Sequence, residues 1–79
     1  MKKALQYIVS SIVDNPKDAK IAEQKQDEMT QLIITVNPED MGKIIGKEGK
    51  VIRSIRNVMK ILAMKHNEKI NISLSETPQ

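Results

Sequence analysis

The sequence predicts an α+β fold in which three helices pack on one face of a three-stranded sheet. Apolar residues recur at helical spacing in 5–13 and 50–66, and between and after these segments they form short β-branched or alternating stretches. The 79 residues, 39% of them hydrophobic, suffice for one compact core. We therefore expect a single domain over 1–79, folded from about 3 to 75, with a frayed tail at 76–79.

The first part of the chain predicts a helix and then two strands. Asn15-Pro16 ends the helix, whose apolar residues fall at i, i+3, i+4, i+7 and i+8. Strands are predicted at 21–26 and 31–36, joined by a polar bend near 27–28. The second strand is mostly β-branched, whereas the first is polar and should keep one face in water. The apolar face of the helix consists of Leu5, Ile8, Val9, Ile12 and Val13.

The second part predicts two helices around a glycine turn, followed by a last strand. Residues 37–40, NPED, supply an N-cap, a proline at the first helical position and acids that suit the helix dipole. They begin a short helix over about 38–45, and a longer helix follows over about 50–66. Apolar and polar residues then alternate over 70–74, as in a strand with one buried face. The order of the strands within the sheet stays open.

The most informative segment is the turn Gly46–Gly49, GKEG, which lies between the apolar pairs Ile44-Ile45 and Val51-Ile52. Its two glycines let the backbone approach a ligand and adopt dihedrals that a side chain would forbid. The start of the next helix adds N–H groups and positive partial charge, both of which suit an anion. A plain helix-turn-helix corner would not require this combination. Glu48 should weaken phosphate binding unless it pairs with a cation. The cations around the turn are Lys43, Lys47, Lys50 and Arg53, and they favour a nucleic acid backbone as the ligand.

Composition restricts how such a ligand is bound. Tyr7 is the only Phe, Trp or Tyr residue, which excludes the platforms of aromatic side chains on which bases stack in RRM and OB-fold proteins. A groove lined by aliphatic side chains is still possible. The net charge of +3 is mildly basic, so affinity should be moderate and sensitive to salt. The chain has no cysteine, which excludes disulfides, thiolate catalysis and the usual zinc sites.

No motif in the sequence supports an enzyme, a cofactor or a metal site. The segment from Gly42 is one residue too short for a Walker A loop, and Glu48 replaces the Ser or Thr that would bind magnesium. A dinucleotide-binding G-x-G-x-x-G fails because Ile44 takes the place of its first glycine. His66, the only histidine, has no titratable partner at a spacing that suits catalysis. We therefore predict a non-enzymatic binding domain without a cofactor.

Taken together, these features resemble a type II KH domain. IIGKEGKVI stands in the place of that family's I-G-x-x-G-x-x-I signature, and the order helix-strand-strand-helix-GxxG-helix-strand agrees over roughly residues 3 to 75. Because the chain is one domain and little else, it is most similar to the stand-alone bacterial KH proteins of the KhpA type. The resemblance implies that the loop holds the backbone of about four nucleotides of single-stranded RNA. It also implies a role as an RNA chaperone or post-transcriptional regulator, linked to cell elongation, division and peptidoglycan homeostasis.

We expect the RNA site to extend from the turn into an aliphatic groove. Base edges would meet Ile44, Ile45 and Ile52, with Ile33 or Ile34 of the second strand as the far wall, although a core position explains any single isoleucine at least as well. The predicted RNA-binding residues are Lys43, Ile44, Ile45, Gly46, Lys47, Glu48, Gly49, Lys50, Ile52 and Arg53.

The third helix is predicted to carry a core face and a basic stripe. Of the stripe formed by Arg53, Arg56 and Lys60, only Arg53 is close enough to the turn to be assigned to RNA, and a solvated face explains the other two equally well. The predicted core face consists of Val51, Ile55, Val58, Met59 and Leu62.

Two apolar residues of the same helix, Ile61 and Met64, lie outside both surfaces. Exposed neighbours of this kind predict a contact with another helix, and with Asn57 they form the expected dimer interface. The family resemblance agrees, since proteins of the KhpA type self-associate and pair with a larger KH protein called KhpB or Jag. A homodimer and a heteromer with such a partner are both expected.

The N-terminal segment superficially resembles a secretory signal, with Lys2 and Lys3 before an apolar run. Polar residues such as Gln6 and Ser10 interrupt the run, and no stretch approaches the length of a membrane span. We expect a cytoplasmic protein that does not bind a membrane.

Two other functions stay open from the sequence. A protein interaction module would use the third helix to dock a partner and would tolerate changes in the turn. An accessory factor for structured ribosomal RNA would bind folded RNA tightly and short single strands weakly. Single-stranded DNA is open as well, because phosphate contacts and an aliphatic groove do not require the 2′-hydroxyl.

Overall fold

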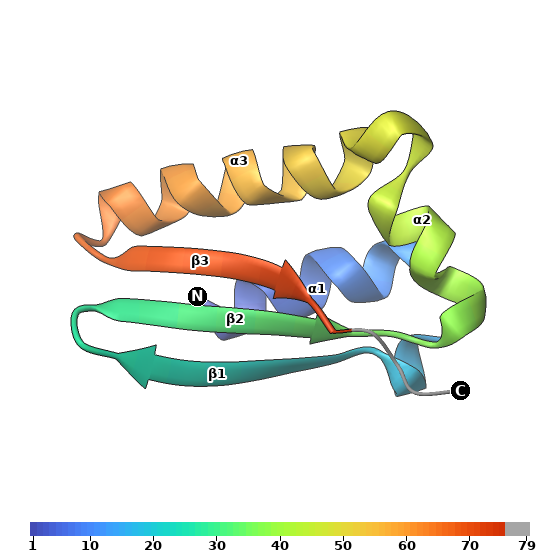
Figure 1. Ribbon diagram of the computed structural model, residues 1–79, viewed down its shortest axis with the longest axis horizontal. Coiled ribbons are helices and arrows are strands. Elements are labelled where there is room, and N and C mark those ends of the chain that lie inside the picture. Colours follow the sequence, from blue (N-terminus) through green and yellow to red (C-terminus); the bar gives the residue numbers. More distant parts are fainter. Residues whose placement is uncertain (76–79) are drawn as a thin grey trace.

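The computed structural model describes residues 1–75, and its helices and strands follow the predicted order (Figure 1). The predicted tail at 76–79 lies outside the described residues. The helices and strands are α1 (Lys2–Ile12), β1 (Lys20–Gln26), β2 (Met29–Thr35), α2 (Met41–Ile45), α3 (Lys50–Lys65) and β3 (Lys69–Leu74), with 3₁₀ turns at Pro16–Asp18, Pro38–Asp40 and Lys47–Gly49.

The three strands form one mixed sheet in the order β1-β2-β3. β1 runs antiparallel to β2 and β3 runs parallel to β2, as the arrows in Figure 1 show. The parallel pair needs a crossover, which α2 and α3 provide by carrying the chain back along the sheet. β2 is therefore the central strand, and β1 and β3 are the two edges.

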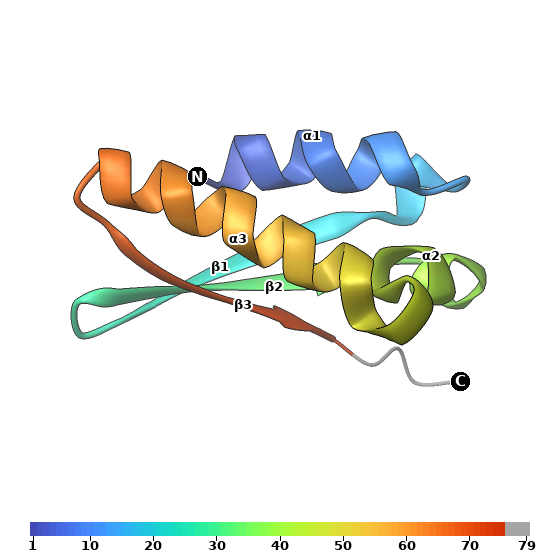
Figure 2. The same ribbon diagram turned by 90° about the horizontal axis from the view of Figure 1, so that it is seen from above.

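The helices lie on one face of the sheet, and the core lies between the two layers (Figure 2). Leu32 and Ile34 of β2 are fully buried against the helices, whereas Ile33 between them lies on the opposite face and is only partly buried. This arrangement confirms the predicted α+β fold with three helices on a three-stranded sheet. The fully buried apolar residues of the helices are Leu5, Val9, Ile44 and Met59.

Two element boundaries differ from the prediction by more than one residue. β2 begins at Met29, two residues earlier than expected, because a two-residue turn joins it to β1 with Asp27 at a left-handed φ of 55°. The helix expected over 38–45 is divided into the 3₁₀ turn Pro38–Asp40 and α2, which begins at Met41. Neither difference moves the glycine turn.

The covered face of α3 also differs from the predicted one. Ile55 and Met59 are buried as predicted, but Val58 is 47% exposed, so its assignment to the core is wrong. Ile52 and Ala63 are buried instead. Apolar residues occupy more of the circumference of this helix than its neighbours cover, so the periodicity alone does not fix which of them are buried. The predicted core residues that are only partly buried are Val51 and Leu62.

Candidate nucleic-acid interface

The turn between α2 and α3 has a left-handed backbone at several positions. Gly46 ends α2 with φ 74° and ψ 173°, and Gly49 precedes α3 with φ 73° and ψ 17°. Glu48 is left-handed too, with φ 57°. The Gly46 N–H donates to the Gly42 carbonyl at 2.8 Å, and the Gly49 N–H donates to the Gly46 carbonyl at 3.1 Å. The backbone is thus tightly bent at the corner where the two helices meet (Figure 1).

Gly46 is required by its contacts as well as by its dihedrals. A Cβ at this position would lie 2.3 Å from Cγ2 of Val51 and 2.8 Å from the Val51 backbone nitrogen, closer than real Cβ atoms approach. At Gly49 the nearest atom would be Nη2 of Arg53 at 3.9 Å, so only the backbone conformation opposes a side chain there. The missing side chain at Gly46 therefore lets the backbone of the glycine turn lie directly against Val51 at the start of α3.

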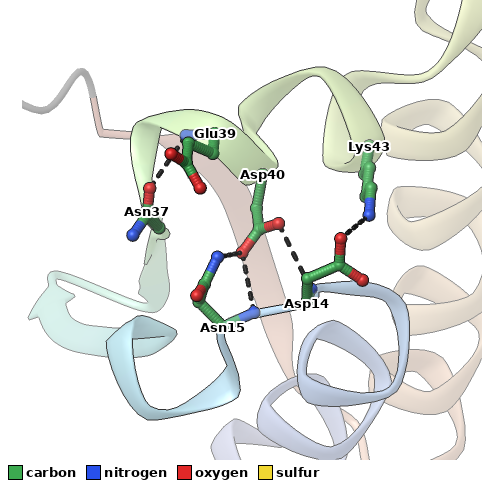
Figure 3. A network of polar contacts seen from close by, with 6 residues as sticks. All are labelled: Asp14, Asn15, Asn37, Glu39, Asp40 and Lys43. Atoms are coloured by element: carbon green, nitrogen blue, oxygen red, sulfur yellow. Dashed lines mark hydrogen bonds and ion pairs between the residues drawn. The ribbon is translucent and has the colours of Figure 1, made fainter.

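The four predicted cations differ in what they contact. Lys47 and Lys50 are exposed beside the turn. Arg53 is also exposed, and its Nη2 donates to the Glu48 carbonyl at 3.1 Å, so it supports the backbone of the turn. Lys43 points toward the segment after α1, where it forms an ion pair with an aspartate (Figure 3). The hydrogen bond within that ion pair raises the pKa of Lys43 and keeps its ammonium group charged.

Only one of the three isoleucines predicted to meet bases is exposed. Ile45 is 37% exposed, whereas Ile44 is fully buried and Ile52 is 8% exposed. Because a buried side chain cannot contact a base, we assign Ile44 and Ile52 to the core beneath the turn. The predicted far wall needs the same correction, since Ile34 is fully buried and Ile33 lies on the opposite face of the central strand.

The strand that borders α3 is the edge strand β3. Arg56 links the two, because its Nε donates to the Ile72 carbonyl at 3.2 Å. From the sequence, Arg56 and Lys60 belonged to a basic stripe but were not assigned to RNA, because a solvated face explained them equally well and only Arg53 was close to the turn. Beside this link lies a recess of about 120 Å³, lined by Arg56, Lys60, Ile70, Asn71 and Ile72.

Comparison with known proteins identifies the domain that carries this turn. A family model described as the KH domain of KhpA/KhpB matches residues 2–74. The chain belongs to the KhpA/KhpB KH-domain family. It is 40% identical over 74 residues to RNA-binding protein KhpA of Clostridium perfringens, an alignment that covers 94% of this chain and 99% of the relative. Identity to RNA-binding protein KhpA of Chlamydia trachomatis is 37% over 76 residues, or 96% of this chain and 97% of the relative.

Membership of the KhpA/KhpB family confirms the resemblance inferred from the sequence. The RNA-binding protein KhpA of Clostridium acetobutylicum is similar as well, with 38% identity over 74 residues that cover 94% of this chain and 99% of that protein. These relatives are named as binding proteins, so family membership also confirms the prediction of a non-enzymatic domain.

This KhpA/KhpB-family domain exposes several apolar side chains on α3. Val58, Ile61 and Met64 are 47%, 57% and 72% exposed, and Asn57 beside them is exposed too. An apolar groove of about 460 Å³ between α1 and α3 reaches the same surface, because Val58 belongs to both. The groove is lined by Ile8, Ile12, Lys50, Val51, Ser54, Ile55 and Val58.

The described residues of this KhpA/KhpB-family domain contain neither a metal-binding cluster nor a membrane-spanning helix. Over residues 1–75, no three His, Cys, Asp or Glu side chains gather into a group that could hold a metal ion. None of the helices in the described part of the chain is both long and apolar enough to cross a membrane.

Proposed function

We propose that this chain binds single-stranded RNA through the turn Gly46–Gly49 and catalyses no reaction. One observation carries the proposal: a left-handed backbone meets the start of the 16-residue helix α3 at one corner of the molecule (Figure 1), and exposed lysines occur at the same positions of the chain. The first N–H groups of a helix have no partner within it and carry positive partial charge, which suits a phosphate. The name of the relatives, RNA-binding protein KhpA, supports RNA as the ligand.

The exposed side chains around the turn take different parts in this proposal. Lys47 and Lys50 neutralise phosphates and make the affinity depend on salt. Arg53 holds the turn through the Glu48 carbonyl, and its remaining donors can face a phosphate. The carboxylate of Glu48 opposes binding. Of the three isoleucines predicted to contact bases, Ile45 is the exposed one and offers an aliphatic contact for a base.

The position of β3 supports a path for the RNA beyond the turn. The recess between α3 and β3 begins one to two helical turns after the glycine turn and is flanked by Arg56 and Lys60. We therefore propose that bases lie against this recess, with β3 rather than β2 as the far wall.

The test is fluorescence anisotropy of a labelled single-stranded RNA titrated with the protein. The variant Lys47→Asp, Glu48→Asp changes the charge of the turn by two units, and aspartate tolerates the left-handed conformation at position 48. We expect its affinity to fall at least about tenfold, and the wild-type affinity to fall with salt at a slope near −0.7 per phosphate contacted.

A matched control is Lys25→Glu, which also changes the charge by two units. Lys25 lies near the hairpin end of β1, which Figure 1 shows at the opposite end of the molecule from α2. Wild-type affinity of the turn variant, with the fold intact by circular dichroism, would contradict the proposal. Competition by a folded ribosomal RNA fragment, where short single strands compete weakly, would favour the accessory-factor function instead.

We also propose that α3 serves association with a second KH chain, either another copy or a KhpB/Jag-type protein. The exposed apolar residues Val58, Ile61 and Met64 support this, because such neighbours occur more often at interfaces than on free surfaces. In the cell such an assembly would act in the cytoplasm as an RNA chaperone or post-transcriptional regulator, with the role in cell elongation and peptidoglycan homeostasis that the family resemblance implies.

Light scattering measures this association directly. Ile61→Lys and Met64→Lys should convert a dimer to a monomer without loss of helix content, since both side chains are exposed. Tyr7→Lys, which changes an exposed apolar residue of α1, should leave the dimer intact. A wild-type mass of one chain at high concentration would contradict the homodimer.

A protein interaction module is the second candidate function. The apolar groove between α1 and α3 favours it, because its lining is almost entirely hydrophobic and it opens beside the exposed residues of α3. In that case the turn variant would leave partner binding unchanged, whereas Ile61→Lys would abolish it.

A further inference from the structure

Asp40 is the only charged side chain that is buried within residues 1–75, with 1% of its surface exposed. It occupies the N-cap position of α2, yet its carboxylate makes no capping hydrogen bond to that helix. An aspartate at an N-cap ordinarily accepts hydrogen bonds from the first turn of its own helix. The direction of this side chain therefore needs another explanation.

The carboxylate of Asp40 instead accepts three hydrogen bonds from the segment that follows α1 (Figure 3). The Asp14 N–H donates to Oδ1 at 3.2 Å, and the Asn15 N–H and Nδ2 donate to Oδ2 at 3.0 and 3.1 Å. Burial alone would raise the pKa of Asp40, but the hydrogen bonds from Asn15 and Asp14 outweigh it and lower the pKa below its usual 3.8. The carboxylate is thus ionised and fully engaged in a link between distant parts of the chain.

A second link joins the same segment to α2 nearly one turn further along. Lys43, three residues after Asp40, forms its ion pair with the carboxylate of Asp14 (Figure 3). Asp14 therefore contacts α2 twice, through its backbone N–H and through its side chain. Together with the buried side chain of Ile44, these two polar contacts restrict the direction of α2.

The direction of α2 determines where the glycine turn lies. α2 has five residues, and Gly46 follows its last residue directly. At 1.5 Å per residue, Gly46 lies about 9 Å from Asp40 along the axis, so a tilt of about 10° at Asp40 would move Gly46 by roughly 1.5 Å. Hydrogen-bond distances vary by only about 0.5 Å, so a turn that binds phosphate through its backbone would lose contacts at such a displacement.

We propose that Asp40 is the positioning residue of the Gly46–Gly49 turn, which it orients through its hydrogen bonds to Asp14 and Asn15. The expected effect of Asp40 on RNA affinity rests on the proposed function. Its effect on the orientation of the turn does not, since that effect follows from the link between α2 and the segment after α1. Asp40 touches no ligand and acts only through α2.

The test is Asp40→Asn, which keeps the size of the side chain. One terminal atom of the amide is a donor, so it cannot accept all three hydrogen bonds. By NMR, we expect the amides of Gly46 and Gly49 to exchange with solvent about three- to tenfold faster, while the amides in the middle of α3 keep their rates. Affinity for single-stranded RNA should fall by a similar factor.

A control separates positioning from general destabilisation. Ile21→Val removes one methyl group from the core under β1, far along the chain from α2, and should lower stability without a selective change at Gly46 and Gly49. If Asp40→Asn speeds exchange only as much as its global stability falls, or if Ile21→Val has the same selective effect, the proposal is wrong. If Asp40→Asn does not fold, Asn15→Ala removes one of the three donors and should show the same selective effect at smaller size.

The readouts also distinguish this proposal from the proposed function. A wild-type protein that binds no RNA would contradict the RNA function, while the exchange rates would still decide whether Asp40 positions the turn. Selective exchange at the turn together with unchanged RNA affinity would contradict the step from orientation to binding.

Discussion

The two ends of α2 are built in opposite ways. At its start, a buried carboxylate is satisfied by three hydrogen bonds (Figure 3). At its end, the backbone is left-handed at Gly46, Glu48 and Gly49, and lysines are exposed to solvent. An irregular, exposed turn can present its backbone to a ligand reproducibly only where the helix that carries it is fixed elsewhere. The contrast is consistent with our two proposals, that the start of α2 positions the turn and that the turn at its end binds the ligand.

Gly46→Ala should have the largest effect on the end of α2 that carries the turn, because Gly46 is the one glycine that has no room for a side chain. The new Cβ would lie 2.3 Å from Val51, and φ is 74°. Overpacking and a left-handed alanine together should lower the free energy of unfolding by about 2–4 kcal/mol. Urea denaturation followed by circular dichroism measures this. Stability equal to wild type would show that the turn and α3 can separate freely.

Acidification should act on the other end of α2. The pKa of Asp40 is lowered in the folded state, so the stability it contributes is fully present above its ordinary value of 3.8 and is lost as pH falls through the lowered folded value. Urea denaturation from about pH 6 to about pH 2 should show a steeper loss for wild type than for Asp40→Asn, and the two curves should converge at the acidic end. Glu23→Gln, which changes an exposed acid of β1, should retain the wild-type slope. Parallel curves for wild type and Asp40→Asn would refute the assignment.

The same contrast explains which parts of the structure the sequence could predict. The glycine turn was predictable because it depends on adjacent residues, and so was β2, whose β-branched run is local. The link from Asp40 was not, since its donors lie 25 and 26 residues away and the pattern NPED fits a simple helix start equally well.

Strand order was the other missing piece of information. Ile34 could be taken for a groove wall only while its full burial was unknown, and Arg56 could be connected to Ile72 only once β3 was placed beside α3. Val58 was misassigned because the apolar residues of α3 cover a wider arc than its neighbours bury, so the period of the helix alone does not determine which of them are buried.

Gly49→Ala should have a smaller effect than Gly46→Ala and sharpen the comparison within the turn. A Cβ at Gly49 meets only Nη2 of Arg53, at 3.9 Å, so the substitution introduces backbone strain without a clash. We expect the free energy of unfolding to fall by about 1 kcal/mol, since a left-handed non-glycine residue costs about 1–2 kcal/mol. Equal losses for the two alanine variants, measured by urea denaturation, would show that the contact with Val51 is not what distinguishes Gly46.

Glu48 should give the smallest effect, and with the opposite sign. It holds a left-handed conformation, φ 57° and ψ 25°, that asparagine adopts more readily than glutamate. Glu48→Asn should therefore raise the free energy of unfolding by about 0.5 kcal/mol and also strengthen RNA binding by removing a negative charge. Glu48→Gln removes the charge but keeps the strain, so it should match Glu48→Asn in RNA affinity and wild type in stability. If the two variants were equally stable, the conformation at position 48 would carry no strain, and charge alone would set the contribution of this residue.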